Sequence, residues 1–352
     1  MTSPREPRER LRELQQQAPE IAARARELLR RQDELLSGCV RPSGPLADAV
    51  LLVHVPPADR DLPPLELAYE LEFLRHAGYR PRLLDAAALT PAATDEALAE
   101  EIDRAEKAIV GLYVVSENRA AAIRLSGRLK KNAARFLFLF GPGLAEPPAA
   151  ATSAEIAADA LVIGPPEITV VALLEAIAAR RDPAALPGVL CPGATGRTPY
   201  RPRPPLAEAD QMPAPTYEDF DPAAYRARAL PLAFNPGGAA ARPRSAARLV
   251  AEMRDHLTRW GVRHFVFLDA AGTVDHRRLD EFATLLAAAD LAVRFRLDLG
   301  YAPEPSRLLA HRLARAGCFE WRLPRPADEI QRAALARACL VAAEAGITVT
   351  ND

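Results

Sequence analysis

Short runs of consecutive apolar residues alternate with amphipathic stretches along most of this chain, and this alternation limits the fold more than any other feature. In the first half the apolar runs are residues 48–55, 82–85, 107–115, 136–140 and 161–163. The stretches between and after them have a helical period and predict helices at 65–76, 94–104, 120–131 and 169–180. Because whole runs are apolar, rather than every second residue, both faces of each strand are expected to be buried. The sequence therefore predicts an α/β domain over residues 45–182, with a flavodoxin-like doubly wound parallel sheet.

The same alternation resumes after residue 229. The predicted strands are 230–234, 264–269, 292–297, 319–323 and 347–350, and the predicted helices are 248–260, 279–287, 307–316 and 329–345. Five units of this length are typical of part of a TIM-like βα barrel, which we place at residues 229–352. The last strand, Ile347 to Thr350, would then be an exposed edge. A protein partner or a second copy of the chain is expected to cover it, unless the chain is a fragment.

Two further segments complete the predicted organisation. Residues 1–38 are charged, with apolar residues at spacings near three, four and seven, which predicts an amphipathic helix. This helix could dimerise, cap a domain or dock on its own chain. Residues 183–228 are rich in proline and arginine and predict an extended linker, in the simplest interpretation a tether lying on the surface.

Composition excludes several classes of partner and site. The 352 residues carry a formal net charge of −1, so no overall field favours nucleic acid or an anionic membrane surface. Four scattered cysteines, Cys39, Cys191, Cys318 and Cys339, show no metal-binding spacing and are expected to be reduced thiols. Neither a signal peptide nor an apolar run of about 18 residues is found in the sequence. A cytoplasmic protein is therefore expected.

Candidate ligand-binding residues follow the predicted strands of the first domain. In doubly wound sheets, ligands bind outside the carboxyl ends of the strands. The candidates in these loops are Pro56, Ser116, Glu117, Asn118, Gly141, Gly143, Gly164 and Glu167. Glycines let a ligand approach the backbone closely, and Ser, Asn and Glu side chains can bond polar groups of a ligand. The alternative is structural: glycines are common at strand-to-helix turns, and Glu167 would simply cap the following helix.

These loops also carry a resemblance to a known family. The Ser after the third strand, the Gly-Pro-Gly of residues 141–143 and the run Ala-Asp-Ala-Leu-Val-Ile-Gly-Pro-Pro-Glu of residues 158–167 resemble the cobalamin-binding domain of B12-dependent radical SAM proteins. Segments 262–269, 313–318 and 342–349 are similar to strand approaches of the radical SAM barrel. The resemblance implies a corrinoid, cobalamin, at the candidate residues. It also implies that no protein histidine binds cobalt, because a D-x-H-x-x-G segment is absent.

The cluster-binding motif of that family is missing. In the family, three thiolates of C-x-x-x-C-x-x-C hold a [4Fe–4S] cluster that chelates S-adenosylmethionine, but the loop from Asn235 to Pro243 has no cysteine. The acidic pair usual after the second barrel strand is reduced to Asp269, followed by Ala270. A Gly-apolar-Glu-Ser end of the fourth strand is replaced by residues 322–326. We therefore expect neither the cluster nor S-adenosylmethionine.

No other catalytic motif takes the place of the missing one. The six histidines are spread out, and no H-E-x-x-H, G-x-S-x-G or Walker pattern occurs, so no catalytic or metal-ligating residue is assigned. Asp255-His256 and Asp275-His276 are expected on helix surfaces or at helix starts, in solvated or capping roles.

Three functional hypotheses remain. The first is a degenerate member of the family, a pseudoenzyme that binds a corrinoid and acts as an accessory or binding protein. The second is a corrinoid-dependent methyltransferase or radical SAM subunit that works with a cluster-bearing partner, or whose barrel binds another substrate. The third is a structural protein that has lost both cofactors.

Overall fold

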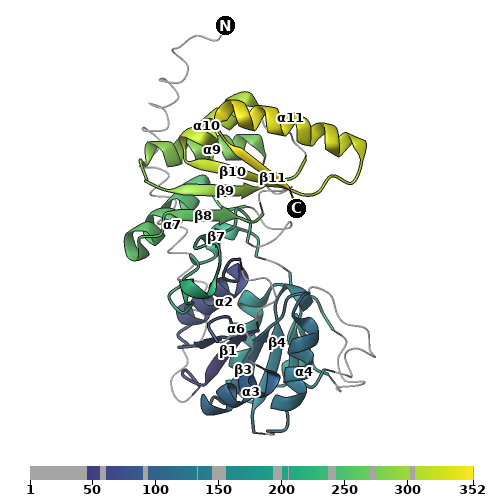
Figure 1. Ribbon diagram of the computed structural model, residues 1–352. Coiled ribbons are helices and arrows are strands. Elements are labelled where there is room, and N and C mark those ends of the chain that lie inside the picture. The colour runs from purple at the N-terminus through teal and green to yellow at the C-terminus, as the bar shows by residue number, and fades with distance from the viewer. Residues whose placement is uncertain are drawn as a thin grey trace.

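The structure is a computed structural model that describes residues 46–55, 61–89, 94–132, 134–144, 156–192, 200–204, 206–236, 243–269, 275–301 and 306–351. The predicted helix 1–38 and Pro56 lie outside these residues. Figure 1 shows two sheets, each with its own helices, in separate halves of the molecule. The predicted α/β architecture is confirmed in both halves.

The first sheet has the strand order β2-β1-β3-β4-β5-β6. Its parallel strands are β1 (Val50–His54), β2 (Arg82–Asp85), β3 (Ile109–Tyr113), β4 (Phe136–Phe140) and β5 (Ala160–Val162). The order 2-1-3-4-5 is that of flavodoxin-like domains and confirms the predicted fold. β6 (Val189–Leu190), antiparallel to β5, was not predicted, because it is only two residues long and lies in a proline-rich stretch.

Helices cover both faces of this sheet. They are α2 (Leu65–His76), α3 (Asp95–Arg104), α4 (Arg119–Leu129) and α6 (Pro166–Ala178). One core layer holds Val50 and Leu52 of β1 with α2 and α6, and the other holds Leu51 and Val53 with α3 and α4. Successive strand side chains thus enter opposite layers, which is why the strands are apolar throughout.

The second sheet is parallel, with the order β11-β10-β9-β8-β7. Its strands are β7 (Leu230–Leu232), β8 (His264–Phe267), β9 (Arg294–Asp298), β10 (Cys318–Leu323) and β11 (Thr348–Asn351), and its helices are α7 (Ala246–Trp260), α9 (His276–Ala288), α10 (Arg307–Arg315) and α11 (Glu329–Ala345). Phenylalanine rings from β8, β9 and α9 pack edge to face in its core. β11 lies at the edge of the sheet, and Thr348, Thr350 and Asn351 are exposed there. This is the open edge predicted for the partial barrel.

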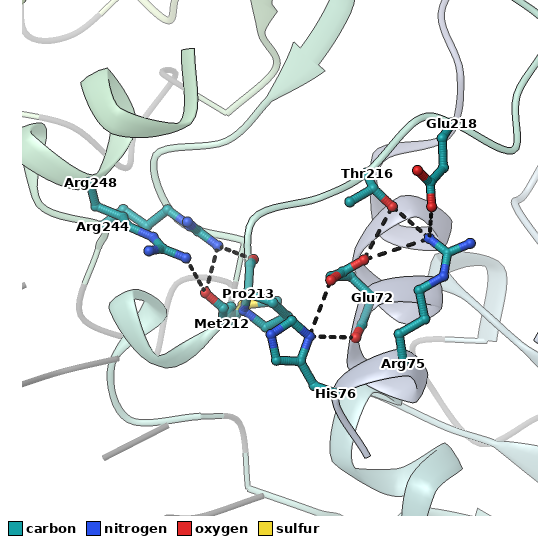
Figure 2. A network of polar contacts seen from close by, with 9 residues as sticks. All are labelled: Glu72, Arg75, His76, Met212, Pro213, Thr216, Glu218, Arg244 and Arg248. Carbon is teal, nitrogen blue, oxygen red and sulfur yellow. Dashed lines mark hydrogen bonds and ion pairs between the residues drawn. The ribbon is translucent and has the colours of Figure 1, made fainter. Parts of the chain in front are cut away.

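Residues 206–229, which we call the strap, connect the two sheets and include the short turns η3 (Ala209–Gln211) and η4 (Pro222–Ala224). On one side Arg75 of α2 donates to Thr216 at 2.8 Å and to Asp219 at 2.5 Å. On the other side Arg244 donates to the Pro213 carbonyl at 2.8 Å, as Figure 2 shows.

The strap also contributes buried side chains to the core, namely Met212, Tyr217, Phe220 and Tyr225. It is therefore packed against both halves and does not lie on the surface as a loose tether. Its apolar residues stand singly among prolines, so no run or period revealed their burial. Among the described helices, none combines the length and apolar character needed to cross a membrane.

Candidate functional site

Asn118 joins the carboxyl ends of β1 and β3, where the strand order reverses. Its amide nitrogen donates to the carbonyls of Val55 and, at 3.2 Å, Tyr113, and its amide oxygen accepts from the Val115 N–H at 2.9 Å. The side chain is buried and both amide hydrogens are engaged, so it shapes this edge and has no free donor for a ligand. The predicted candidates beside it, Ser116 and Glu117, are exposed and face solvent at the same edge.

The three candidate glycines differ in what surrounds them. A Cβ at Gly141, where φ is +120°, would lie 2.5 Å from the Val114 carbonyl oxygen, and one at Gly143 would lie 2.7 Å from the Val115 carbonyl carbon. These two glycines therefore let the loop after β4 pack on the end of β3, and close approach of a ligand does not explain them. Gly164 has φ of +80° but open space at its Cβ position. It is the candidate glycine whose missing side chain leaves room for a bound molecule.

Glu167 lies in the first turn of α6 but is buried. Burial, reinforced by the charge of Glu66, raises its pKa to about 7, although a backbone hydrogen bond opposes this. Sequence reasoning missed its neighbour Glu70, whose carboxylate is fully buried with no hydrogen-bond partner among the described residues. Burial and then the charge of Glu167 raise the pKa of Glu70 well above its usual value. Both carboxyl groups therefore keep a proton to a higher pH than an exposed glutamate does, and in the protonated form each can donate a hydrogen bond.

A third carboxylate of this region is paired. The Tyr113 hydroxyl donates to Glu66 at 2.8 Å, and burial together with the charge of Glu66 raises the pKa of Tyr113 well above its usual value. Glu66 and Glu70 are four residues apart in an otherwise apolar stretch of α2, so they lie on one helix face. That spacing was the available signal for this acidic group, in which Glu66 is exposed and Glu70 is buried.

Glu167 makes stability depend on pH in a defined direction. Its pKa rises from 4.5 to about 7 on folding, so the folded chain keeps a proton that the unfolded chain releases in this interval. The free energy of unfolding should therefore fall as the pH rises from 4.5 to 7, by up to about 1.4 kcal/mol per pH unit. In Glu167→Gln we expect a shallower slope over this range by urea denaturation. Glu100→Gln, at an exposed position of α3, serves as the control, and equal slopes in all three proteins would contradict the assignment.

A buried cluster that sequence reasoning did not find lies at the ends of β1 and β2. His54 Nδ1 is 2.9 Å from Asp85 Oδ1, and the Tyr225 hydroxyl donates to Asp85 Oδ2 at 2.7 Å. The Ala87 N–H also donates to Asp85. The cluster anchors the strap to the first sheet. A histidine inside the apolar run 48–55, opposite an acid ending the next strand, was the signal for it.

At the carboxyl end of β7 and β8, Asp269 is committed to the backbone. Its two oxygens accept from the N–H groups of Phe234 at 2.7 Å and Asn235 at 2.6 Å. The Arg244 N–H donates to the Phe234 carbonyl at 2.7 Å, which closes the base of the loop 235–243. Burial raises the pKa of Asp269 even though these hydrogen bonds lower it. Among the described residues, no three His, Cys, Asp or Glu side chains are placed to hold a metal ion together.

The two Asp-His pairs of the second half differ in their roles. Asp275 caps α9 by accepting from the Arg278 N–H at 2.8 Å, as predicted. His256 is buried, which corrects the expectation of a solvated role. Its ring stacks on Trp260 with centroids 5.0 Å apart, and burial lowers its pKa to about 4, so it is neutral at pH 7. The His256 ring also packs near the Tyr217 ring of the strap, and this contact could not be predicted because its two partners lie far apart in the sequence.

No known family model and no curated protein matches the chain. Solved structures do. The radical S-adenosylmethionine methyltransferase TsrM from Kitasatospora setae, with tryptophan and a SAM analogue bound, is 18% identical with a TM-score of 0.67, and the match covers 86% of this chain and 66% of TsrM. The same enzyme with cobalamin and a [4Fe-4S] cluster bound matches with a TM-score of 0.66 over 68% of its length. The cobalamin-dependent S-adenosylmethionine radical enzyme OxsB is 13% identical with a TM-score of 0.67, over 86% of this chain and 48% of OxsB. At these identities the likeness establishes a shared fold, and this chain spans about two thirds of TsrM and half of OxsB.

Proposed function

We propose that this chain is a degenerate relative of the cobalamin-dependent radical SAM proteins that binds a corrinoid at the carboxyl edge of its first sheet. In this proposal it acts as an accessory or binding protein without its own SAM-cleaving site. The observation that carries the proposal is the flavodoxin-like strand order, with an edge where Ser116 and Glu117 are exposed and Gly164 faces open space. Three solved structures of similar fold, one of TsrM and two of OxsB, have cobalamin bound.

The residues of this edge fit a large amide-bearing ligand. Ser116 and Glu117 can bond its amide groups, and Gly164 leaves room for it beside α6. A protonated Glu167 would donate to a ligand carbonyl, whereas Asn118, Gly141 and Gly143 hold the edge in shape. When bound, cobalamin supplies methyl-transfer chemistry at cobalt.

The second half does not fit a cluster. The loop from Asn235 to Pro243 contains glycine, proline, alanine, one asparagine and one arginine, and none of these can replace three thiolates. The carboxylate of Asp269 is occupied by the base of the same loop. The alternative, a corrinoid-dependent subunit that works with a cluster-bearing partner, is favoured only by the exposed edge of β11, which a partner chain could extend.

The proposal predicts that the purified chain retains added hydroxocobalamin. After anaerobic incubation and desalting we expect corrin absorption bands in the protein fraction. Ser116→Trp, which places a large ring at the exposed edge, should weaken binding at least about tenfold, equivalent to about 1.4 kcal/mol. Gly127→Trp, near the other end of α4 where nothing lies within 4 Å of the Cβ position, is the matched control.

The same sample tests the cobalt ligand. The D-x-H-x-x-G segment is absent and His54, at the end of β1, is buried, so the cobalt(II) EPR spectrum should show no splitting from a protein nitrogen. A colourless protein after desalting would contradict the proposal, and only the third hypothesis, a structural protein that has lost both cofactors, would remain. Iron–sulfur absorbance in the chain purified alone would instead overturn our interpretation of the loop.

A further inference from the structure

A cavity of about 390 Å³ lies between the strap, the start of β7 and the residues before α2. Its walls include Pro63, Tyr217, Phe220, Tyr225, Leu230 and Val262. Leu230 begins β7 and Val262 precedes β8, so the cavity is at the opposite end of these strands from Asp269. None of the candidate corrinoid residues that the structure describes lines it. Its volume is within the range of small-molecule sites, roughly 300–1,000 Å³.

The aromatic walls are held in place by hydrogen bonds that do not involve the cavity. The Tyr217 hydroxyl donates to the Pro231 carbonyl at 2.6 Å, and the Tyr225 hydroxyl donates to Asp85 at 2.7 Å. The Phe220 ring lies between them, with centroids 6.0 Å from Tyr217 and 6.4 Å from Tyr225. Three buried rings therefore present a preorganised apolar surface, and the hydroxyls of the two tyrosines already donate hydrogen bonds within the protein. Such a surface suits the flat face of an aromatic ring.

The charged side chains that line the cavity are Asp221 and Arg228. Asp221 accepts from the Ala223 N–H at 2.9 Å and so caps η4. Arg228 is exposed and has no hydrogen bond or ion pair with any described residue. Nearby Arg226 is different, because it pairs with Asp61 at 2.8 Å. Among the described residues, Arg228 is thus a cation of the cavity wall that no carboxylate pairs with.

The backbone of Arg228 is also unusual. Four described residues other than glycine have positive φ, and three of them, Glu106, Arg180 and Asp290, directly follow a helix C-cap, where this conformation is common. Arg228, with φ of 43°, lies in the strap and follows no helix. Strained residues without a local structural reason concentrate at binding sites.

We propose that this cavity binds a small planar aromatic anion. Its ring lies among Tyr217, Phe220 and Tyr225, and its carboxylate or sulfonate pairs with Arg228. This site is separate from the corrinoid edge and does not depend on the function proposed above.

The test uses 2-naphthoate as the probe with the full chain, by isothermal titration calorimetry. We expect binding that weakens at least tenfold in Arg228→Gln and is retained in Arg226→Gln, the matched loss of a neighbouring positive charge. Ala223→Trp, which fills the cavity from an exposed position, should abolish binding. Thermal unfolding of each variant confirms that it is folded.

The charge requirement is tested with 2-naphthylmethanol and 2-naphthylmethylamine, which keep the ring and replace the anion by a neutral or cationic group. Both should bind at least tenfold more weakly than 2-naphthoate. Equal binding of the three probes, undiminished binding to Ala223→Trp, or no binding of 2-naphthoate at millimolar concentration would overturn the proposal.

Discussion

Replacing Arg244 with leucine should lower the free energy of unfolding by about 3–5 kcal/mol, because the buried carboxylate of Glu252 loses its closer counter-charge and keeps only Arg248, whose Nε lies 3.5 Å away. Arg244 and Glu252 form an ion pair whose side chains are almost completely inaccessible to water. Arg244 also donates to the carbonyls of Met212 and Pro213 and lies 5.2 Å from the Tyr69 ring centroid. The substitution therefore removes the contact that joins α7, the strap and α2. Urea denaturation measures the loss.

Two further variants separate the ion pair from general packing. Glu252→Leu should be about as destabilising as Arg244→Leu, and the double variant should lose clearly less than the sum, because neither charge is then left buried alone. Arg259→Leu breaks an exposed pair with Asp255 in the same helix and should cost less than about 1 kcal/mol. Additive losses in the double variant would show that the pair is not coupled.

Gly141→Ala should destabilise the first domain by about 3 kcal/mol or more. The new Cβ would lie 2.5 Å from the backbone oxygen of Val114, which no side-chain rotation relieves, and φ of +120° adds strain of its own. Gly164→Ala has a positive φ but no clash, so we expect about 1 kcal/mol.

The control for these glycine variants is Gly127→Ala. Gly127 lies within α4 with open space around its Cβ position, and alanine there should stabilise by about 0.5–1 kcal/mol. Chemical denaturation should give the lowest free energy of unfolding for Gly141→Ala, which has both a clash and strain. Gly164→Ala, which has strain alone, should be intermediate, and Gly127→Ala, which gains helix propensity, should be the most stable. Equal stability of Gly141→Ala and Gly164→Ala would refute the close approach of the loop after β4 to β3.

The positions of most helices and strands followed from the sequence because their signals are local. α2, β2, β4 and α11 begin and end at the predicted residues, since apolar runs and helical period extend to their boundaries. The first residue of a helix differs from the prediction where a capping side chain sets it. α7 begins directly after Ser245, whose side chain accepts from the Arg248 N–H, and not at the predicted residue 248. The parallel order of the first sheet also followed, because only a sheet covered on both faces suits strands without polar positions.

The candidate site was predictable as a place but not in its chemistry. The loops after β3, β4 and β5 lie at one edge of the sheet, as expected from the sequence, because parallel strands end together. Whether a side chain there is free was decided by partners far away in the chain. Asn118 donates a hydrogen bond to the Val55 carbonyl, 63 residues earlier. Position 141 must be glycine because any Cβ there would clash with the backbone oxygen of Val114.

From its residues alone, this chain determined its α/β class, its two βα series and the absence of cysteine from the loop 235–243, since each of these is a property of short contiguous segments. The tertiary structure alone decided that the strap packs against both halves, that Glu70 and Arg244 are buried, and that the Tyr225 hydroxyl donates a hydrogen bond to Asp85. The physical reason is distance along the chain: the Tyr225–Asp85 hydrogen bond spans 140 residues, and burial depends on which distant segments pack together.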